Sequence, residues 1–404
     1  MEPTHPLSLP AFRMFLAGRA CSGMALTLFR ATVLWQIYDL THQPIALAAL
    51  GLAQFVPQAL ASLPAGAAAD TWNRRTIALV AQAFRASVSV SVLILMSATA
   101  AIPVAAIVGA GMLVSTIGAF EAPARASLLP RIVGLERLSR AVPIHSAVAT
   151  AAFMTGPAIC GFLISFGGPA LAYACDALLV TLSILALSTL PTAVGKVEEG
   201  ALSWKKVLEG LRFVRNNPVV LGCMTLDMMA VIFGGAGALL PAMARDVLHA
   251  GPREYGLLAA ASDLGAVAAT VLLLSMRPVG RVGRVLLGAV LAYGLAMIVF
   301  GFARTVPLAI IAYAIAGAAD GVSVVMRSTA IQLSTPEDLR GRVTSVSTLF
   351  IGASNQLGAV ESGVVAQVTS TQFSIVSGGA LSMLVTAVIA AVFPALRRYR
   401  TALP

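Results

Sequence analysis

The feature that most constrains this chain is a succession of apolar stretches separated by short breaks that contain Arg, Gly or Pro. Each stretch is close to the roughly 20 residues that a helix needs to cross a bilayer. Apolar residues make up 58% of the 404 residues and charged residues 11%, and the mean hydropathy is +0.89. A single soluble core cannot bury so much apolar surface, so the sequence predicts an all-α membrane protein.

The apolar windows predict twelve transmembrane helices in two six-helix halves. The first six are expected near residues 13–38, 44–69, 76–98, 102–122, 141–166 and 170–190. The other six are expected near 218–240, 254–276, 284–303, 305–326, 343–367 and 372–395. The longest polar break should hold an amphipathic helix from about Ser203 to Arg215. The predicted domains are therefore 1–190, a cytoplasmic linker at 191–216, and 217–404.

Positive charges gather in alternate breaks, which sets the predicted topology. One set of breaks holds Arg74, Arg75, Arg125, Arg131, Arg137, Arg140, Lys196, Lys205, Lys206, Arg212, Arg215, Arg277, Arg281, Arg284, Arg327, Arg340, Arg342, Arg397, Arg398 and Arg400. The opposite set holds Arg245, Arg253 and Arg304. The positive-inside rule then places both termini in the cytoplasm of a multi-pass inner-membrane protein. The formal charge of +10 is explained by basic residues that set the topology, so no nucleic-acid partner is expected.

The two halves show signs of an internal repeat. A shift of 202 positions superposes Arg13 on Arg215, Arg125 on Arg327, Arg140 on Arg342, Gly156 on Gly358, Gly161 on Gly363 and Glu136 on Asp338. Several matches at one offset favour duplication, although glycine is abundant in this chain. Parallel six-helix repeats are one way in which transporters build a central cavity.

Residues that would indicate an enzyme or a metal site do not occur in the necessary patterns. The sequence contains no HExxH, GxSxG or P-loop motif. Its four cysteines lie in apolar stretches without CxxC spacing, so neither a disulfide framework nor a zinc site is expected. We therefore expect no catalytic residue, no metal and no cofactor, and we expect an ion gradient as the energy source.

A loop motif and a helix motif carry a family resemblance. The stretch from Gly66 through Asp70 to Arg74 and Arg75 resembles the G-x-x-x-D-x-x-x-R-R/K signature of the major facilitator superfamily. The resemblance implies the fold, and it implies that this loop gates the transport cycle. Arg125 is added to that gating set. The alternative is that Arg74 and Arg75 only anchor the topology.

The fifth predicted span is similar to an antiporter motif of the same superfamily. Gly156, Pro157 and Gly161 match the pattern G-P-x-x-G-G except that Cys160 replaces a glycine. Ordinary close packing of helices would also select these residues. The segments AFRMFLAGR, LPRIVGLERLSRA and QLSTPEDLRGRV resemble the enterobactin-exporter branch. The resemblance implies a proton-coupled exporter of siderophore-like or other small amphipathic compounds.

Two departures from the superfamily patterns limit the analogy. The fourth predicted span, AAIVGAGMLVSTIGAF, lacks the central Arg that many drug/proton antiporters carry. The second-half copy of the loop signature, near Arg277 and Arg281, has no matching Asp. The first departure leaves the proton-coupling residue unassigned by analogy, and the second suggests that the halves gate differently.

Ionisable side chains within the predicted spans are the candidates for coupling or substrate contact, because each is costly in a bilayer. They are Asp227, Glu361, Asp320, Arg30, Asp263 and His145. Asp227 is the first choice for the proton carrier, since it lies near the centre of its span. Structural ion pairs are the alternative, for instance between Arg30 and Glu361. Arg85 and Asp176, on outer helices, are expected to be structural.

Two other functions remain open at this stage. The chain could be an importer or facilitator of a small metabolite, or a membrane receptor that transports nothing, because a fold does not determine a function. The expected partners are a small-molecule substrate, protons and the lipid bilayer, and the expected state is a monomer.

Overall fold

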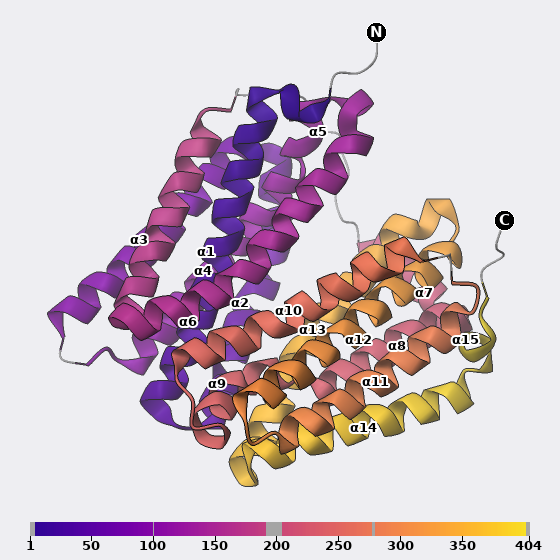
Figure 1. Cartoon of the computed structure of the whole chain (residues 1–404). Coiled ribbons are helices and arrows are strands. Elements are labelled where there is room, and N and C mark those ends of the chain that lie inside the picture. Colours follow the sequence, from indigo (N-terminus) through magenta and orange to yellow (C-terminus); the bar gives the residue numbers. More distant parts are fainter. Residues whose placement is uncertain (1–4, 100, 191–203, 277–278, 401–404) are drawn as a thin grey trace. The chain divides into compact units, whose positions relative to one another are not determined.

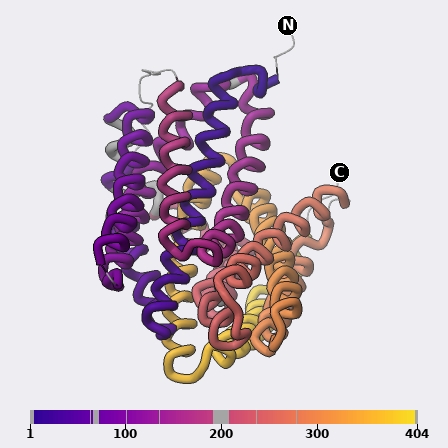
Figure 2. Tube along the Cα trace, turned by 60° about the vertical axis from the view of Figure 1, so that its left-hand side comes forward, coloured from indigo at the N-terminus to yellow at the C-terminus, as the bar shows by residue number. Residues whose placement is uncertain are grey.

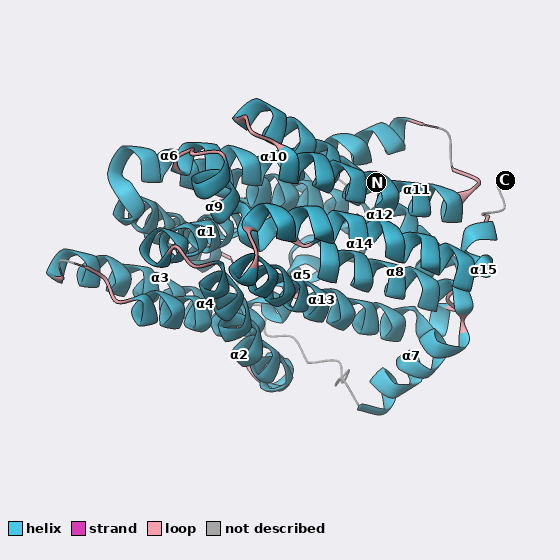
Figure 3. Ribbon diagram, turned by 90° about the horizontal axis from the view of Figure 1, so that it is seen from below, coloured by secondary structure: helices cyan, strands magenta, loops and turns pink. Residues whose placement is uncertain are grey.

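The computed structural model describes residues 5–99, 101–190, 204–276 and 279–400 (Figure 1). The described part of the chain consists of helices joined by short loops and contains no strand (Figure 3). This confirms the predicted all-α class. The described residues form two compact units, of Met1–Leu40 with Leu52–Ala201 and of Thr41–Gly51 with Leu202–Pro404.

The first unit is built mainly from long helices. Its elements are η1 (Pro6–Ser8), α1 (Pro10–Thr41), α2 (Pro44–Thr71), α3 (Arg74–Ala98), α4 (Val104–Ala126), α5 (Leu128–Val133) and α6 (Leu135–Ser188). The last residue of α1, Thr41, and the beginning of α2, up to Gly51, belong to the second unit. Helix α3 lies beside both α4 and α6 (Figure 2).

The second unit contains the remaining helices. They are α7 (Trp204–Asn216), α8 (Pro218–Gly234), η2 (Ala236–Leu239), α9 (Leu240–Ala242), η3 (Met243–Val247), α10 (Pro252–Ser275), α11 (Val282–Phe302), α12 (Val306–Leu333), η4 (Glu337–Leu339), α13 (Arg340–Val368), α14 (Thr371–Val392) and α15 (Pro394–Arg398). Helix α12 packs between α10 and α11, and α14 packs against α11 and α8.

Within the described residues, nine helical segments are long and apolar enough to cross a membrane. One of them, in α6, contains two helical parts, because Gly167 and Gly168 leave the helical conformation and Gly168 has a φ of 69°. Helices α1 and α13 are 32 and 29 residues long but are not among the nine. Charged and polar side chains interrupt both of them. The number twelve therefore stays a prediction.

Several helix starts are fixed by side chains that cap free backbone N–H groups. The side chain of Asn73 accepts a 3.0 Å hydrogen bond from the backbone of Arg75 at the start of α3. Asn217 caps α8 in the same way, and Pro218 follows it at the first helical position, where no N–H is required. Ser370 caps α14. These caps explain why the helices begin where the polar breaks end.

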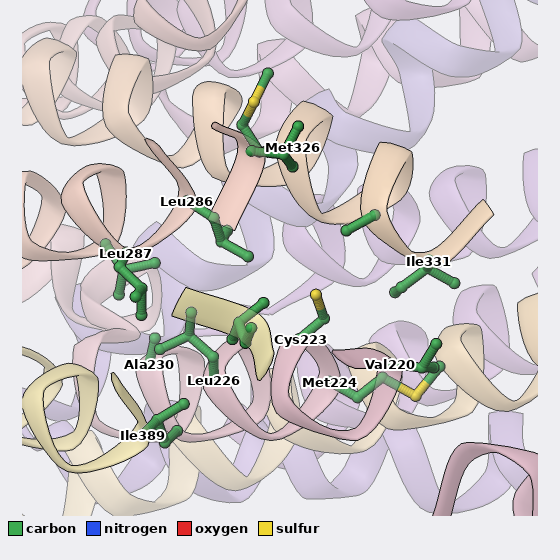
Figure 4. Packing of buried hydrophobic residues seen from close by; sticks show 14 of the residues in the cluster. Val220, Cys223, Met224, Leu226, Ala230, Leu286, Leu287, Met326, Ile331 and Ile389 are labelled. Atoms are coloured by element: carbon green, nitrogen blue, oxygen red, sulfur yellow. The ribbon is translucent and has the colours of Figure 1, made fainter. Parts of the chain in front are cut away.

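The core of the second unit is an apolar cluster (Figure 4) whose residues come from α7, α8, α11, α12, α13, α14 and α15. Cys223 and Leu226 of α8 pack with Leu286 of α11, Met326 of α12 and Ile389 of α14. Val343 and Leu396 add contacts from α13 and α15. This cluster holds α8 in place, and two carboxylates described below, Asp227 and Asp320, lie on its helices α8 and α12.

Candidate functional site

The first unit contains a buried ion pair between two helices. Arg85 of α3 donates a 2.9 Å hydrogen bond to Asp176 of α6, and their side chains are 3% and 0% exposed. Ser89 donates to the second carboxylate oxygen at 2.6 Å, and Arg85 also donates to the carbonyl of Ser22 in α1. Arg85 and Asp176 were each expected to be structural, and the structure pairs them with each other.

A second buried polar cluster adjoins the first and centres on Arg125. This residue forms an ion pair with Glu121, one turn earlier in α4, at 2.6 Å. It also donates to the Ser183 hydroxyl at 3.0 Å, and Ser183 donates to the carbonyl of Gly18. Gln82 donates to Glu121 at 3.0 Å. The two clusters together link α1, α3, α4 and α6 through groups that are costly to bury unpaired.

Placing Arg125 in a cytoplasmic break was wrong. The residue lies in the last turn of α4 and is 6% exposed. Helix α4 continues beyond the apolar window that ended near residue 122, and the buried Glu121 compensates the charge. The spacing of four between Glu121 and Arg125 is the sequence signal that could have indicated the pair.

The same error applies to Arg327 in the second unit. It lies in the interior of α12 and forms an ion pair with Asp227 of α8. The two side chains are 8% and 11% exposed. Asp227 was predicted as a functional carboxylate, but its partner was missed because 100 positions separate the two residues. The repeat offset does relate Arg327 to Arg125, and both prove to be buried and paired.

A cavity of about 190 Å³ lies beside this ion pair within the second unit. Its walls come from α8, α10, α11, α12 and α13 and from the residue after α8. The residues that line it are Asp227, Ala230, Val231, Gly235, Ser262, Val290, Tyr293, Tyr313, Asp320, Ser323 and Asn355. Two predicted candidates, Asp227 and Asp320, therefore face one space. The lining contains two carboxylates, two phenols, two hydroxyls and an amide, and no basic residue.

Two tyrosines give the cavity a defined wall. Tyr293 donates a 2.6 Å hydrogen bond to the carbonyl of Gly234, at the last residue of α8. A Cβ on Gly234 would lie 2.6 Å from the Tyr293 ring, so a larger residue would displace that ring. Tyr313 stacks on Phe300 with ring centroids 4.8 Å apart. Helix α8 ends here, and the short segments η2 and α9 continue the apolar span, so the predicted window 218–240 lies within the candidate membrane span Pro218–Val247.

The other predicted cavity residues lie elsewhere. Asp263 follows the cavity residue Ser262 in α10 but is not part of the lining. Glu361 lies in α13, where Ser362 donates to it at 3.3 Å. Arg30 and His145 belong to the first unit, and His145 stacks on Phe15 at 5.6 Å. The second unit thus brings Asp227 and Asp320 together.

The predicted gating residues are only partly described. The side chains of Gly66 and Asp70 lie outside the described residues. Arg74 begins α3, and Arg75 binds the last two carbonyls of α6, those of Leu187 and Ser188. Carbonyls in the last turn of a helix lack the usual N–H partner four residues on, so the Arg75 guanidinium caps the end of α6 together with the Leu190 N–H, which donates to Leu187 at 3.2 Å.

Gly156 allows α6 to contact α1 closely, while Pro157 and Gly161 follow it within α6. A Cβ at position 156 would lie 1.9 Å from the Thr27 hydroxyl and 2.7 Å from the Met24 carbonyl. The repeat-related Gly358 of α13 lies equally close to α8, where a Cβ would be 2.5 Å from a carbonyl. Both units therefore use the matched glycine for helix contact.

Comparison with known proteins establishes the family. A family model described as transmembrane secretion effector matches residues 1–402. The chain belongs to this family of the major facilitator superfamily. The multidrug efflux pump Tap of Mycolicibacterium fortuitum is 27% identical, with 97% of this chain and 96% of the relative aligned. The enterobactin exporter EntS of Shigella boydii serotype 4 is also 27% identical, with 98% and 94% aligned.

Solved structures agree on the fold. A peptide transporter of the POT family in complex with alafosfalin has a TM-score of 0.75 at 12% identity, covering 98% of this chain and 96% of its own. A bacterial homologue of the iron transporter ferroportin, in the inward-facing state, has a TM-score of 0.74 at 16% identity, covering 96% and 99%. The protein is a multi-pass membrane transporter with the major facilitator fold, as the motifs predicted.

Proposed function

We propose that this transporter is a proton-coupled exporter of small amphipathic molecules. The observation that carries the proposal is the cavity of the second unit, where Asp227 and Asp320 share a space also lined by aromatic and apolar side chains. Carboxylates inside a membrane protein can exchange protons with water that enters the cavity. A mixed apolar and polar lining suits an amphipathic ligand.

Proton coupling would work through the ion pair of Asp227 with Arg327. The arginine stabilises the ionised carboxylate, so protonating Asp227 would weaken the tie between α8 and α12. Deprotonation would restore the tie. In this proposal α8, which ends at Gly234, shifts relative to α12 when the pair is broken and returns when it re-forms, as an alternating cycle needs.

Export is favoured over import by two observations. The names of the two relatives describe export from the cell, of enterobactin in one case and of several drugs in the other. The step from Gly156 to Pro157 also resembles an antiporter motif of the superfamily. An importer or facilitator of a small metabolite is the second candidate.

The test is accumulation in inside-out membrane vesicles. Enterobactin and a panel of fluorescent amphipathic dyes serve as probes, and an acidic vesicle interior supplies the gradient. Export coupled to protons predicts uptake that a protonophore abolishes. Uptake only by right-side-out vesicles would identify an importer, and equilibration without accumulation would identify a facilitator.

The cellular placement is part of the same proposal. We propose an inner-membrane location with both termini in the cytoplasm, because the basic residues gather in alternate breaks. We also propose that the transporter is a monomer. Reporter fusions to each terminus test the orientation, since alkaline phosphatase is active only outside the cytoplasm. Light scattering of the detergent-solubilised protein tests the monomer.

A further inference from the structure

We infer that the cavity of the second unit selects ligands that carry an ammonium group, with Asp320 as the recognition residue. This inference rests on the proposed function, since it names the substrate class of the same site. It departs from the enterobactin analogy, because nothing in this cavity would pair with an acidic group.

The first step of the argument is the charge balance at the cavity. Asp227 is neutralised by Arg327, which is not part of the lining. Asp320 forms no ion pair with any described residue, and the lining contains no Lys, Arg or His. One carboxylate is therefore left to interact with whatever occupies the space. A ligand with a positive charge would gain an ion pair there, whereas an anion would be repelled.

The second step is the chemistry of the walls. Tyr293 and Tyr313 line the same space, and aromatic rings attract cations across their faces. Ser262, Ser323 and Asn355 offer oxygen atoms that can accept hydrogen bonds from an ammonium group. Ala230, Val231 and Val290 supply apolar contact for a short hydrocarbon or a phenyl ring. The groups present thus match an amine with an attached apolar body.

The third step is the support of the site. Tyr293 is held by its hydrogen bond to Gly234, and Tyr313 by stacking on Phe300. A second carboxylate, Asp263, lies in the same unit next to Ser262 but outside the lining. It provides a matched control, because replacing it removes one negative charge from the unit without changing the cavity wall.

The experiment uses three probes with similar frames and different charges: 2-phenylethylamine, 2-phenylethanol and 3-phenylpropionate. Binding to the full-length protein in nanodiscs is measured by equilibrium dialysis at neutral pH without any gradient. We expect the amine to bind at least about tenfold more tightly than the alcohol, a difference of about 1.4 kcal/mol. We expect the propionate to bind most weakly.

The variants decide whether Asp320 is responsible. Asp320→Asn should reduce amine binding to the level of the alcohol and leave alcohol binding unchanged, whereas Asp263→Asn should keep the preference for the amine. Unchanged melting temperatures establish that both variants are folded. Equal binding of amine and propionate, or an amine preference that survives in Asp320→Asn, would overturn the inference. The binding assay measures no transport, so the two hypotheses can fail separately. Selective binding of the amine together with a failed vesicle assay would refute the proposed export and leave the inference standing.

Discussion

Breaking the ion pair of Asp227 and Arg327 should destabilise the protein strongly. Asp227→Asn leaves the guanidinium of Arg327 without its carboxylate, in a site where the two side chains are 11% and 8% exposed. Removing one partner of a buried pair costs about 3–5 kcal/mol, because the remaining charge is desolvated and unpaired. The ion pair of Glu209 with Arg342 is the contrast, since its side chains are 55% and 34% exposed. Such a pair contributes about 0–1 kcal/mol.

The double variant Asp227→Asn with Arg327→Gln separates the cost of an unpaired charge from the value of the pair. Replacing both ions by neutral groups removes the desolvated charge, so most of the lost stability should return. The assay is the apparent melting temperature of the purified protein in detergent. Each kcal/mol corresponds to about 2–4 °C for a unit of this size. Asp227→Asn should therefore melt on the order of 10 °C lower, and Glu209→Gln close to the parent.

The double variant also permits a test of coupling that misfolding does not obscure. We expect it to catalyse exchange of substrate across the membrane but not accumulation driven by a pH difference, because it has no carboxylate to titrate at position 227. An Asp227→Asn protein that melts within about 2 °C of the parent would refute the energetic reasoning. Accumulation by the double variant under an imposed pH difference would exclude Asp227 as the coupling residue, and Glu361 would be tested next.

Three further predictions concern other positions. Gly156→Ala should lower the stability by about 1–3 kcal/mol, because its Cβ would lie 1.9 Å from the Thr27 hydroxyl. The control Gly109→Ala should leave the stability unchanged, because no atom of the described residues outside its own helix lies within 4 Å of its Cβ. Equal melting temperatures of the two variants would contradict the packing argument. Arg75→Gln should make the end of α6 more accessible to hydrogen exchange, and unchanged protection would show that the carbonyls need no cap. Asp70→Asn should impair transport without affecting membrane insertion, and normal turnover would exclude the gating role.

The positions of most helices could be predicted from hydropathy. The window at 76–98 corresponds to α3 at Arg74–Ala98, and the window at 372–395 to α14 at Thr371–Val392. The break expected between residues 166 and 170 coincides with the non-helical Gly167 and Gly168. Backbone N–H and C=O groups without a hydrogen-bond partner are costly in lipid, and a helix pairs them within the segment. A long apolar segment therefore has few alternatives to a helix.

The polar contacts inside the units could not be predicted in the same way. Arg125 and Arg327 lie at the ends of apolar windows, where an arginine is normally a topology anchor. Whether such a residue faces solvent or the protein interior depends on neighbouring helices that are distant in the sequence. Arg85 and Asp176 were expected to be structural, but the structure was needed to show that they pair with each other and that Ser89 also donates to Asp176.

The two arginines related by the repeat give a reason to propose proton coupling in the second unit. Arg125 pairs with Glu121 of its own helix, and the equivalent of Glu121 in the second half is Ser323. Arg327 pairs instead with Asp227 of another helix. The first pair joins two turns of α4, and the contact of Glu121 with another helix is a hydrogen bond from Gln82 of α3, which a protonated carboxyl group can still accept. Neutralising Glu121 would therefore break no ion pair between helices. The second pair joins α8 to α12, so a single proton on Asp227 changes a contact between two helices. We therefore expect neutralisation of Asp227, and not of Glu121, to alter the pH dependence of transport.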